Sequence, residues 1–235
     1  MQKTFRKDLS ISFSKDEANL VYENYVRYFK ASKQIENIRI PEPLGIKDST
    51  IEFEYIPGLD NTLSHMWYRD EFWDSNLMYR IGNALGKLHS SQGDISKDIF
   101  LYGDFVPHNV VKGSEKLFFF DTEPAAYRQN FIESFKNSAY VDIVSMLFFI
   151  FTCHYFKTPW RFFRNKRSLA QSYLRGYEDE SMTKLEKKKL LFYIKKQELK
   201  WLFDRGGQHG LIKKYAKYFF VKIVLFVQIY LYKAI

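Results

Sequence analysis

One short stretch, LYGDFVPHNVVKGSEKLFFFDTEPAA, constrains the fold of this chain more than any other, and it runs from Leu101 to Ala126. Within it, residues 109–111 and 117–120 are short β-leaning runs, and Lys112-Gly113-Ser114 between them favours a turn. The stretch therefore predicts a tight β-hairpin. Because two strands joined by a short turn run side by side, the outer ends of this hairpin must lie close together.

Three polar side chains stand at these outer ends. Asp104 and Asn109 precede or open the first predicted strand, and Asp121 directly follows the second. Carboxylate and amide oxygens are the hard ligands that Mg²⁺ takes, usually together with water and substrate phosphates. A further carboxylate near an acceptor hydroxyl can orient that hydroxyl and take its proton. Positioning, metal binding and proton removal are what phosphoryl transfer requires of a protein.

The segment Tyr102–Asn109, YGDFVPHN, resembles the catalytic loop of the kinase-like phosphotransferases. This superfamily includes the aminoglycoside phosphotransferases, the choline kinases and the lipopolysaccharide core kinases. FFFDTEPA resembles its metal-binding segment, IGNALGKLHSS the helix before the loop, and YVDIVSML a later helix that supports the loop. Four signatures in the right order, across roughly residues 80–145, are far more specific than any one of them alone.

The resemblance implies a role for each residue of the polar set. Asp104 would be the catalytic base or the residue that orients the acceptor hydroxyl. Asn109 and Asp121 would bind Mg²⁺, and Glu123 would lie nearby. An ordinary carboxylate at the end of a structural element is the alternative interpretation of Glu123.

Further residues of the motif are expected to support the loop rather than to react. Asp142 would hold the loop backbone, although an Asp that opens a helix is also favourable simply as a cap or dipole partner. Tyr102 stands where the family has a supporting His, and it can still donate a hydrogen bond. His108 is interpreted as a loop histidine rather than a catalytic one.

The N-terminal part begins with a helix signal. Ser14-Lys15-Asp16-Glu17 is a capping-box pattern, and the apolar residues that follow recur at helical spacing, which predicts a helix over 15–31. IRIPEPLGI and STIEFEYIPG then form two β-leaning runs around Lys47-Asp48 and predict a second hairpin. Pro57-Gly58 breaks the chain, and a hinge is expected there.

This N-terminal part resembles half of the family's small lobe, in which a strand lysine reaches the ATP phosphates and pairs with a helix glutamate. Lys3 is the candidate lysine and Glu17 its candidate partner, with Lys7 and Glu23 as competitors. A surface lysine and an ordinary capping-box glutamate are the alternative. The backbone from Glu54 to Ile56 is expected to meet the adenine.

The charge of the chain is strongly one-sided. Residues 157–235 hold 19 Lys and Arg against 6 Asp and Glu, a balance of +13, whereas residues 1–156 have a balance of −4. A basic surface favours an anionic partner, and a merely solvated basic face is the alternative. The basic C-terminal part argues against a polycationic acceptor and suits an anionic small molecule or glycan as the acceptor. Nucleic acid is unlikely as a partner, since no nucleic-acid-binding motif is apparent.

The last helix, KKYAKYFFVKIVLFVQIYLYKAI, is expected either to lie in a membrane interface or to pack against the rest of the chain. It is too short to span a bilayer. The single cysteine, Cys153, allows no internal disulfide, and the N-terminus is too polar for a signal peptide. A cytoplasmic location, with peripheral contact at an anionic membrane, is therefore expected.

The sequence as a whole predicts a two-lobed, protein-kinase-like α+β fold, with a truncated N-lobe over 1–58 and a mainly helical C-lobe over 59–235. The favoured function is an ATP- and Mg²⁺-dependent phosphotransferase acting on a hydroxyl of a small molecule or glycan, such as a lipopolysaccharide-core or other surface-polysaccharide sugar. The family's Gly-rich loop is not seen, so a pseudokinase that acts as a binding protein is the alternative. A protein kinase is a weaker third option, because no Ala-Pro-Glu motif follows Asp121.

Overall fold

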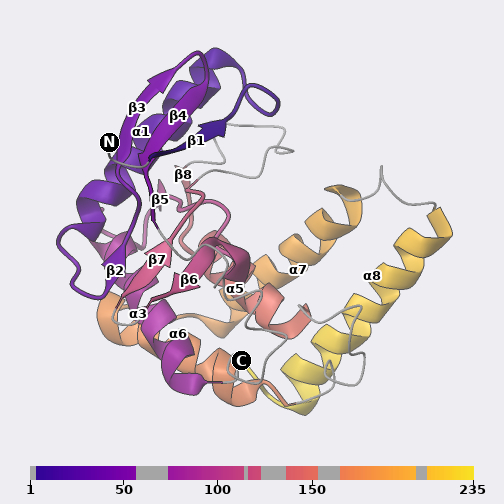
Figure 1. The fold of residues 1–235 in the computed structure, drawn as a ribbon. Helices are drawn as coiled ribbons and strands as arrows, with labels where there is room; N and C mark the ends of the chain where they lie inside the picture. Colours follow the sequence, from indigo (N-terminus) through magenta and orange to yellow (C-terminus); the bar gives the residue numbers. More distant parts are fainter. Residues whose placement is uncertain (1–3, 57–73, 114–115, 123–135, 153–164, 205–210) are drawn as a thin grey trace.

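The chain has an α+β fold, as the sequence predicts, and its described residues form three small sheets followed by a mainly helical second half (Figure 1). The computed structural model describes residues 4–56, 74–113, 116–122, 136–152, 165–204 and 211–235. The predicted hinge at Pro57-Gly58 lies outside these residues. The division at residue 58 stays a prediction.

The N-terminal sheet has three antiparallel strands in the order β1 (Thr4–Asp8), β4 (Thr50–Glu54), β3 (Pro43–Lys47). The hairpin predicted around Lys47-Asp48 is confirmed as β3 and β4. Asp48 and Ser49 both have positive φ, 47° and 62°, which is the backbone that matches the twist of a two-residue hairpin.

Helix α1 (Lys15–Ser32) covers one face of this sheet and confirms the helix predicted over 15–31. The predicted capping box is also present, because the Ser14 N–H donates to the Glu17 carboxylate at 2.7 Å and the Glu17 N–H donates to the Ser14 hydroxyl at 3.4 Å. Burial of the apolar stripe of α1 against the sheet holds the two together. This cluster consists of Leu9, Phe13, Ala18, Val21, Tyr25, Ile51 and Phe53.

The run IRIPEPLGI does not form the single strand that the second predicted hairpin implied. Its first residues form β2 (Ile38–Arg39), which pairs in parallel with β7 (Leu117–Phe119), and only its end enters β3. Pro41 separates the two parts, and since proline has no N–H and a fixed φ, one ladder cannot continue through it. The split joins the N-terminal part of the chain to the central hairpin.

That central hairpin is confirmed as β6 (Val110–Lys112) and β7, paired antiparallel in the sheet order β2-β7-β6. A further pair, β5 (Ile99–Phe100) with β8 (Lys136–Asn137), lies at the entrance to the loop before β6. These strands are only two or three residues long, but they fix the positions at which the polar residues of the motif leave the sheets.

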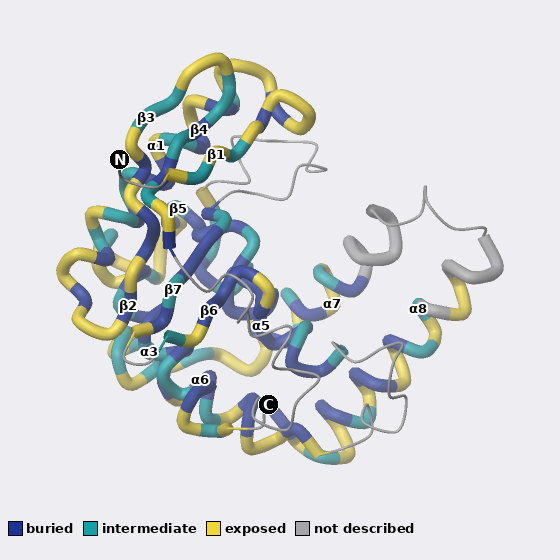
Figure 2. Tube along the Cα trace, viewed as in Figure 1, coloured by how far each residue is buried: buried dark blue, intermediate teal, exposed yellow. Residues whose placement is uncertain are grey.

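Five α-helices complete the described fold, and their bounds are α3 (Ser75–Ser90), α5 (Tyr140–Thr152), α6 (Arg167–Ser181), α7 (Lys187–Asp204) and α8 (Leu211–Phe226). A π-helix (Val227–Leu231) continues α8. Helix α5 is buried without a break from Asp142 to Phe148, as its apolar sequence predicts, and Figure 2 shows its dark trace in the centre. No helix among the described residues is long and apolar enough to cross a membrane.

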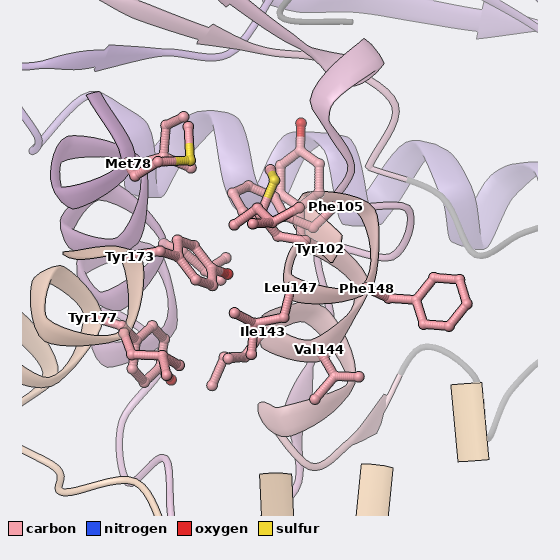
Figure 3. Close-up of a cluster of buried hydrophobic side chains, with 14 of the residues drawn as sticks. Met78, Tyr102, Phe105, Ile143, Val144, Leu147, Phe148, Tyr173 and Tyr177 are labelled. Carbon is pink, nitrogen blue, oxygen red and sulfur yellow. The ribbon is translucent and has the colours of Figure 1, made fainter. Parts of the chain in front are cut away.

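The main core surrounds α5 (Figure 3). Ile143 and Leu147 of this helix lie among Tyr102 and Phe105 from the loop and Tyr173 from α6. Aromatic edge-to-face contacts order this cluster, with ring centroids of Tyr102 and Phe105 5.3 Å apart. The loop of the motif is therefore anchored by its own side chains in the core.

Two glycines allow α3 and α6 to touch backbone to backbone. A Cβ atom at Gly82 would stand 1.9 Å from the carbonyl oxygen of Tyr173, and one at Gly176 would stand 2.1 Å from that of Tyr79. We expect Gly82→Ala to lower the free energy of unfolding by about 3 kcal/mol, because α3 and α6 must move apart. Urea unfolding measures this, with Gly45→Ala as the matched control, since nothing lies within 4 Å of a Cβ there. Equal midpoints for both variants would show that the helices are not in close contact.

Candidate active site

The loop between β5 and β6 presents the first residues of the polar set. Gly103 has φ of 109°, a backbone conformation that favours glycine, and Asp104 follows it with a partly exposed side chain. The loop ends in a short 3₁₀ turn, Pro107–Asn109, whose first residue is a proline. Proline suits this position because its missing N–H would have had no partner in the turn.

The hairpin then brings Asp121 to the same place. Val110 pairs with Phe119, and the Phe120 N–H donates to the carbonyl of Asn109 at 2.9 Å. Asp121 therefore comes one residue after the position opposite Asn109. The side-chain nitrogen of Asn109 donates to the backbone carbonyl of Asp104 at 2.8 Å and lies 3.4 Å from its carboxylate. The structure thus gathers Asp104, Asn109 and Asp121 at one end of the hairpin.

Two of these residues have oxygens suited to Mg²⁺. The amide nitrogen of Asn109 is held by Asp104, so its carbonyl oxygen is the end that remains for a ligand. The carboxylate of Asp121 is 38% exposed. Within the described ranges, no three His, Cys, Asp or Glu side chains group together as a complete metal site. A site with only a few protein ligands is typical of Mg²⁺, since this ion usually keeps several waters and binds substrate phosphates.

A lysine reaches the site from β1, but it is Lys7. Its Nζ lies 2.5 Å from a carboxylate oxygen of Asp121, and the hydroxyl of Tyr25 donates to the same oxygen at 3.3 Å. The preferred candidate, Lys3, lies outside the described residues. The competitor named from the sequence is thus the lysine that the structure brings to the candidate metal ligand.

The candidate partner Glu17 lies in the first turn of α1, and its pairing with Lys3 stays a prediction because Lys3 lies outside the described residues. The Glu17 carboxylate accepts the Ser14 N–H in the capping box, so the ordinary capping alternative accounts for it. Glu23, the competitor, is exposed on α1. Lys7 forms an ion pair with Asp121, and a lysine–glutamate pair of the kind that the resemblance implies stays a prediction.

Asp142 anchors the backbone of the loop through hydrogen bonds to its carboxylate. It is fully buried and accepts the backbone N–H of Tyr102 at 2.6 Å and that of Gly103 at 3.1 Å. The Nε2 of His89 also lies 3.1 Å from the Asp142 carboxylate, and the Nδ1 of His89 contacts the Tyr177 hydroxyl at 3.0 Å. A buried carboxylate with these partners fixes the backbone on either side of Tyr102.

Tyr102 supports the site through its hydroxyl, which donates to the carbonyl of Phe120 at 2.6 Å. Burial, and then the neighbouring carboxylates, of which Asp121 contributes most, raise the pKa of the Tyr102 phenol well above its ordinary value. The phenol therefore keeps its proton and remains a donor. Tyr102 links the loop to the residue just before Asp121.

Two supporting residues could not be assigned from the sequence. His89 ends the apolar stripe of α3, and only this position hinted at a buried partner. Asn24 lies among the buried residues of α1, and its amide donates to the carbonyls of Leu101 at 3.1 Å and Thr122 at 3.0 Å. A polar residue on an otherwise apolar helix face was the available signal. Asn24 ties α1 to both sides of the site.

The expected adenine-contacting segment is only partly available. The Glu54 N–H donates to the carbonyl of Glu42 at 3.0 Å, and its carboxylate pairs with Arg39 at 2.5 Å. The Glu54 N–H is thus engaged within the chain, and contact between adenine and the backbone from Glu54 to Ile56 stays a prediction. Ile56, by contrast, packs with Val111 and Phe120 in a small apolar cluster beside the polar set.

His108 and Glu123 are the remaining residues that the sequence analysis singled out near the loop. His108 is 46% exposed, and its Nε2 lies 3.7 Å from the Asp104 carboxylate. Its ring also contacts that of Phe149 on α5, with centroids 5.5 Å apart. Glu123 lies outside the described residues.

Buried tyrosines around the site make a testable prediction about alkaline pH. Burial raises the pKa of each of their phenols, so the unfolded chain loses these protons first and stability falls as pH rises above roughly 10. Each buried phenol contributes a slope of about 1.4 kcal/mol per pH unit there. These residues are Tyr28, Tyr102, Tyr173 and Tyr177.

Urea unfolding between about pH 9 and 11, with tyrosine absorbance as the probe, measures this slope. Tyr173→Phe should reduce the slope by the contribution of one phenol. It should remove no hydrogen bond, since the Tyr173 hydroxyl has no hydrogen-bond partner within the described part of the chain. A stability that stays flat across this range would contradict the burial of these phenols.

Comparison with known proteins identifies the fold. No family model and no curated protein matches the chain. Solved structures of glucosamine kinases are similar to it. One contains glucosamine, ADP and inorganic phosphate, and it aligns with a TM-score of 0.56 at 10% identity over 88% of this chain and 66% of its own. Two other crystal forms give TM-scores of 0.56 and 0.58 at 11% identity, over 87% and 88% of this chain and 68% and 67% of theirs. The chain thus spans about two thirds of the length of these kinases and shares their fold.

Proposed function

We propose that this chain is an ATP- and Mg²⁺-dependent phosphotransferase that phosphorylates a hydroxyl of a sugar or sugar-containing molecule, with a two-lobed, protein-kinase-like arrangement. The observation that supports this most is the gathering of Asp104, Asn109 and Asp121 at one end of the β6–β7 hairpin. The glucosamine kinase fold agrees with it.

The proposed division of work follows from the side chains. Asp104 is partly exposed, so it can accept a hydrogen bond from an acceptor hydroxyl and take its proton as the hydroxyl attacks. The carbonyl oxygen of Asn109 and the carboxylate of Asp121 would hold Mg²⁺, which supplies charge neutralisation at the phosphates. Asp142 and Tyr102 keep the loop and hairpin in register.

Two features next to the polar set support the proposal of nucleotide binding. The apolar cluster of Ile56, Val111 and Phe120 offers a surface for a base. Lys7 supplies a positive charge next to Asp121. In the proposed nucleotide complex, Lys7 would exchange its contact with Asp121 for a contact with phosphate oxygens, because an ammonium group binds either anion well.

The acceptor is proposed at the level of a class. Glucosamine is the sugar in one similar structure, whereas the basic C-terminal part of this chain favours an acidic or phosphorylated sugar. A sugar of a lipopolysaccharide core or another surface polysaccharide fits this combination.

One observation favours the alternative of a non-catalytic binding protein. The Lys7–Asp121 ion pair, at 2.5 Å, occupies a carboxylate oxygen that a metal ion would need. A protein in which this pair never opens would keep the fold without binding Mg²⁺ and nucleotide.

An acceptor panel tests the proposed function. Neutral, amino, acidic and phosphorylated sugars are each incubated with the protein, ATP and Mg²⁺, and phosphorus NMR detects any new phosphomonoester. We expect one acceptor class to give a phosphomonoester together with ADP, and only when Mg²⁺ is present. ATP that stays intact with every acceptor, in a folded protein that binds no nucleotide, would favour the binding-protein alternative.

A further inference from the structure

The C-terminal helix has two apolar faces, and only one of them is used in the fold. Val221, Val224, Leu225 and Ile229 are buried, and most of them join the main core. Figure 2 shows buried and exposed positions alternating along α8 and the π-helix that continues it. The packing expected of this helix is therefore confirmed for its inner face.

The outer face is also apolar, although it is exposed. It carries large side chains at intervals of four, four, three and four residues, which places them along one side of a helix. We call this set the outer stripe, and it consists of Tyr215, Phe219, Ile223, Phe226 and Tyr230, with exposed fractions of 60%, 66%, 39%, 54% and 60%. A contiguous exposed apolar surface of this kind indicates a binding partner.

The outer stripe continues into a groove between α7 and α8. This groove has a volume of about 670 Å³, and Ile223, Phe226 and Tyr230 of the stripe line one side of it. Phe192 of α7, which is 60% exposed, lines the other side. The apolar surface therefore extends across two helices rather than along one.

Among the described residues of this surface, the exposed charged side chains are lysines. Residues 211–235 contain five lysines and no Asp or Glu, and the exposed Lys222 stands 5.0 Å from the ring of Tyr218. Lys188 and Lys195 are exposed along the groove. The one acid among the described lining residues, Glu198, is only 8% exposed. The accessible part of the surface thus combines aromatic rings with ammonium groups.

We propose that the outer stripe binds the surface of an anionic lipid bilayer. Phenylalanine and isoleucine side chains would enter the boundary between headgroups and acyl chains, and the tyrosine hydroxyls would remain in the wet headgroup layer. The flanking lysines would pair with lipid phosphates. This inference does not depend on the proposed phosphotransferase, although it would bring a kinase close to glycolipid acceptors.

Vesicle flotation with the full chain tests the proposal. The protein is mixed with vesicles of phosphatidylcholine alone, or of phosphatidylcholine with phosphatidylglycerol, at low and high salt. We expect binding to the anionic vesicles only, and weaker binding at high salt. Phe219→Gln/Phe226→Gln should lower the partition coefficient at least about ten-fold, and Lys188→Gln and Lys222→Gln should each lower it about five-fold.

Matched controls separate binding from folding. Ile11 and Met182 are 92% and 89% exposed and do not line the groove, so Ile11→Gln/Met182→Gln should bind vesicles as the unchanged chain does. Thermal unfolding should show the same midpoint for all these variants, because every substituted side chain is exposed. Phosphotransfer to a water-soluble sugar is measured in parallel and should be unaffected.

Three results would overturn the proposal. The first is equal binding to neutral and anionic vesicles, and the second is unchanged binding by the Phe219→Gln/Phe226→Gln variant. The third is a chain that binds no vesicles but is a dimer in light scattering, with the dimer lost in that variant. This last result would assign the outer stripe to an interface between two copies of the chain.

Discussion

Asp104→Asn is expected to lower phosphoryl transfer by about 10³-fold, the range found when a general base is removed. Asparagine has the same shape, so the contact with Asn109 and the path of the loop should persist. It cannot take a proton, however, and it orients an acceptor hydroxyl less well. Steady-state assays with the best acceptor of the panel measure the rate constant, and calorimetry measures the affinity for ATP with Mg²⁺, which we expect to change by less than about three-fold.

The control for this variant is Asp98→Asn. Asp98 is an exposed carboxylate in the segment that leads to the loop, and its removal should leave both rate and affinity unchanged. Full transfer activity in Asp104→Asn would refute the assignment of Asp104 as the base. Loss of ATP affinity together with activity would instead make Asp104 a part of the nucleotide site.

Asp121→Asn is expected to weaken Mg²⁺-dependent ATP binding about 100-fold, since one carboxylate contributes most of the negative charge offered to the ion. The substitution also removes the charge partner of Lys7, which lies 2.5 Å away. Binding of ATP without Mg²⁺ should therefore remain or improve slightly, because Lys7 is then released for phosphate. Calorimetric titrations with and without Mg²⁺ separate these two effects.

The Lys7→Met variant complements Asp121→Asn, because it removes the lysine of the ion pair and keeps the carboxylate. It leaves Asp121 intact, so Mg²⁺ dependence should persist while the affinity for ATP falls in both conditions. If Asp121→Asn and the unchanged chain show the same dependence on Mg²⁺, Asp121 is not a metal ligand and the proposed division of work is wrong.

Local sequence signals predicted the elements that carry the site. The capping box at Ser14 and Glu17, the turn at Lys47-Asp48 and the apolar run of α5 each act over a few residues, and each is confirmed. The central hairpin was also predictable, because a turn between two β-leaning runs determines that their ends meet. The gathering of Asp104, Asn109 and Asp121 follows from that hairpin.

Contacts between distant segments were not predictable in the same way. The contact of Lys7 with Asp121 depends on how β1 lies against β4, where Lys7 is opposite Ile51, and no local pattern sets this register. Asn24 and His89 act through partners about 100 and 50 residues away. Their polarity within apolar stripes was visible in the sequence, but the identity of each partner depends on tertiary packing.

The Lys7–Asp121 pair gives the two candidate functions a common structural origin. In a phosphotransferase it would keep Asp121 in place until the nucleotide and Mg²⁺ arrive, and in a binding protein it would be permanent. Its side chains are only 19% and 38% exposed, so the interaction is screened less than a surface pair. Which function applies depends on whether Mg²⁺ and phosphate together displace Lys7 from Asp121.

Calorimetric titration of ATP into the purified chain, with and without Mg²⁺, tests the central claim most directly. The proposed site predicts saturable binding that depends on Mg²⁺ and has a stoichiometry of about one nucleotide per chain. Circular dichroism and thermal unfolding on the same sample establish that the chain is folded. A well-folded chain that binds no ATP in either condition would contradict the account and would leave the protein as a binding module with a kinase fold.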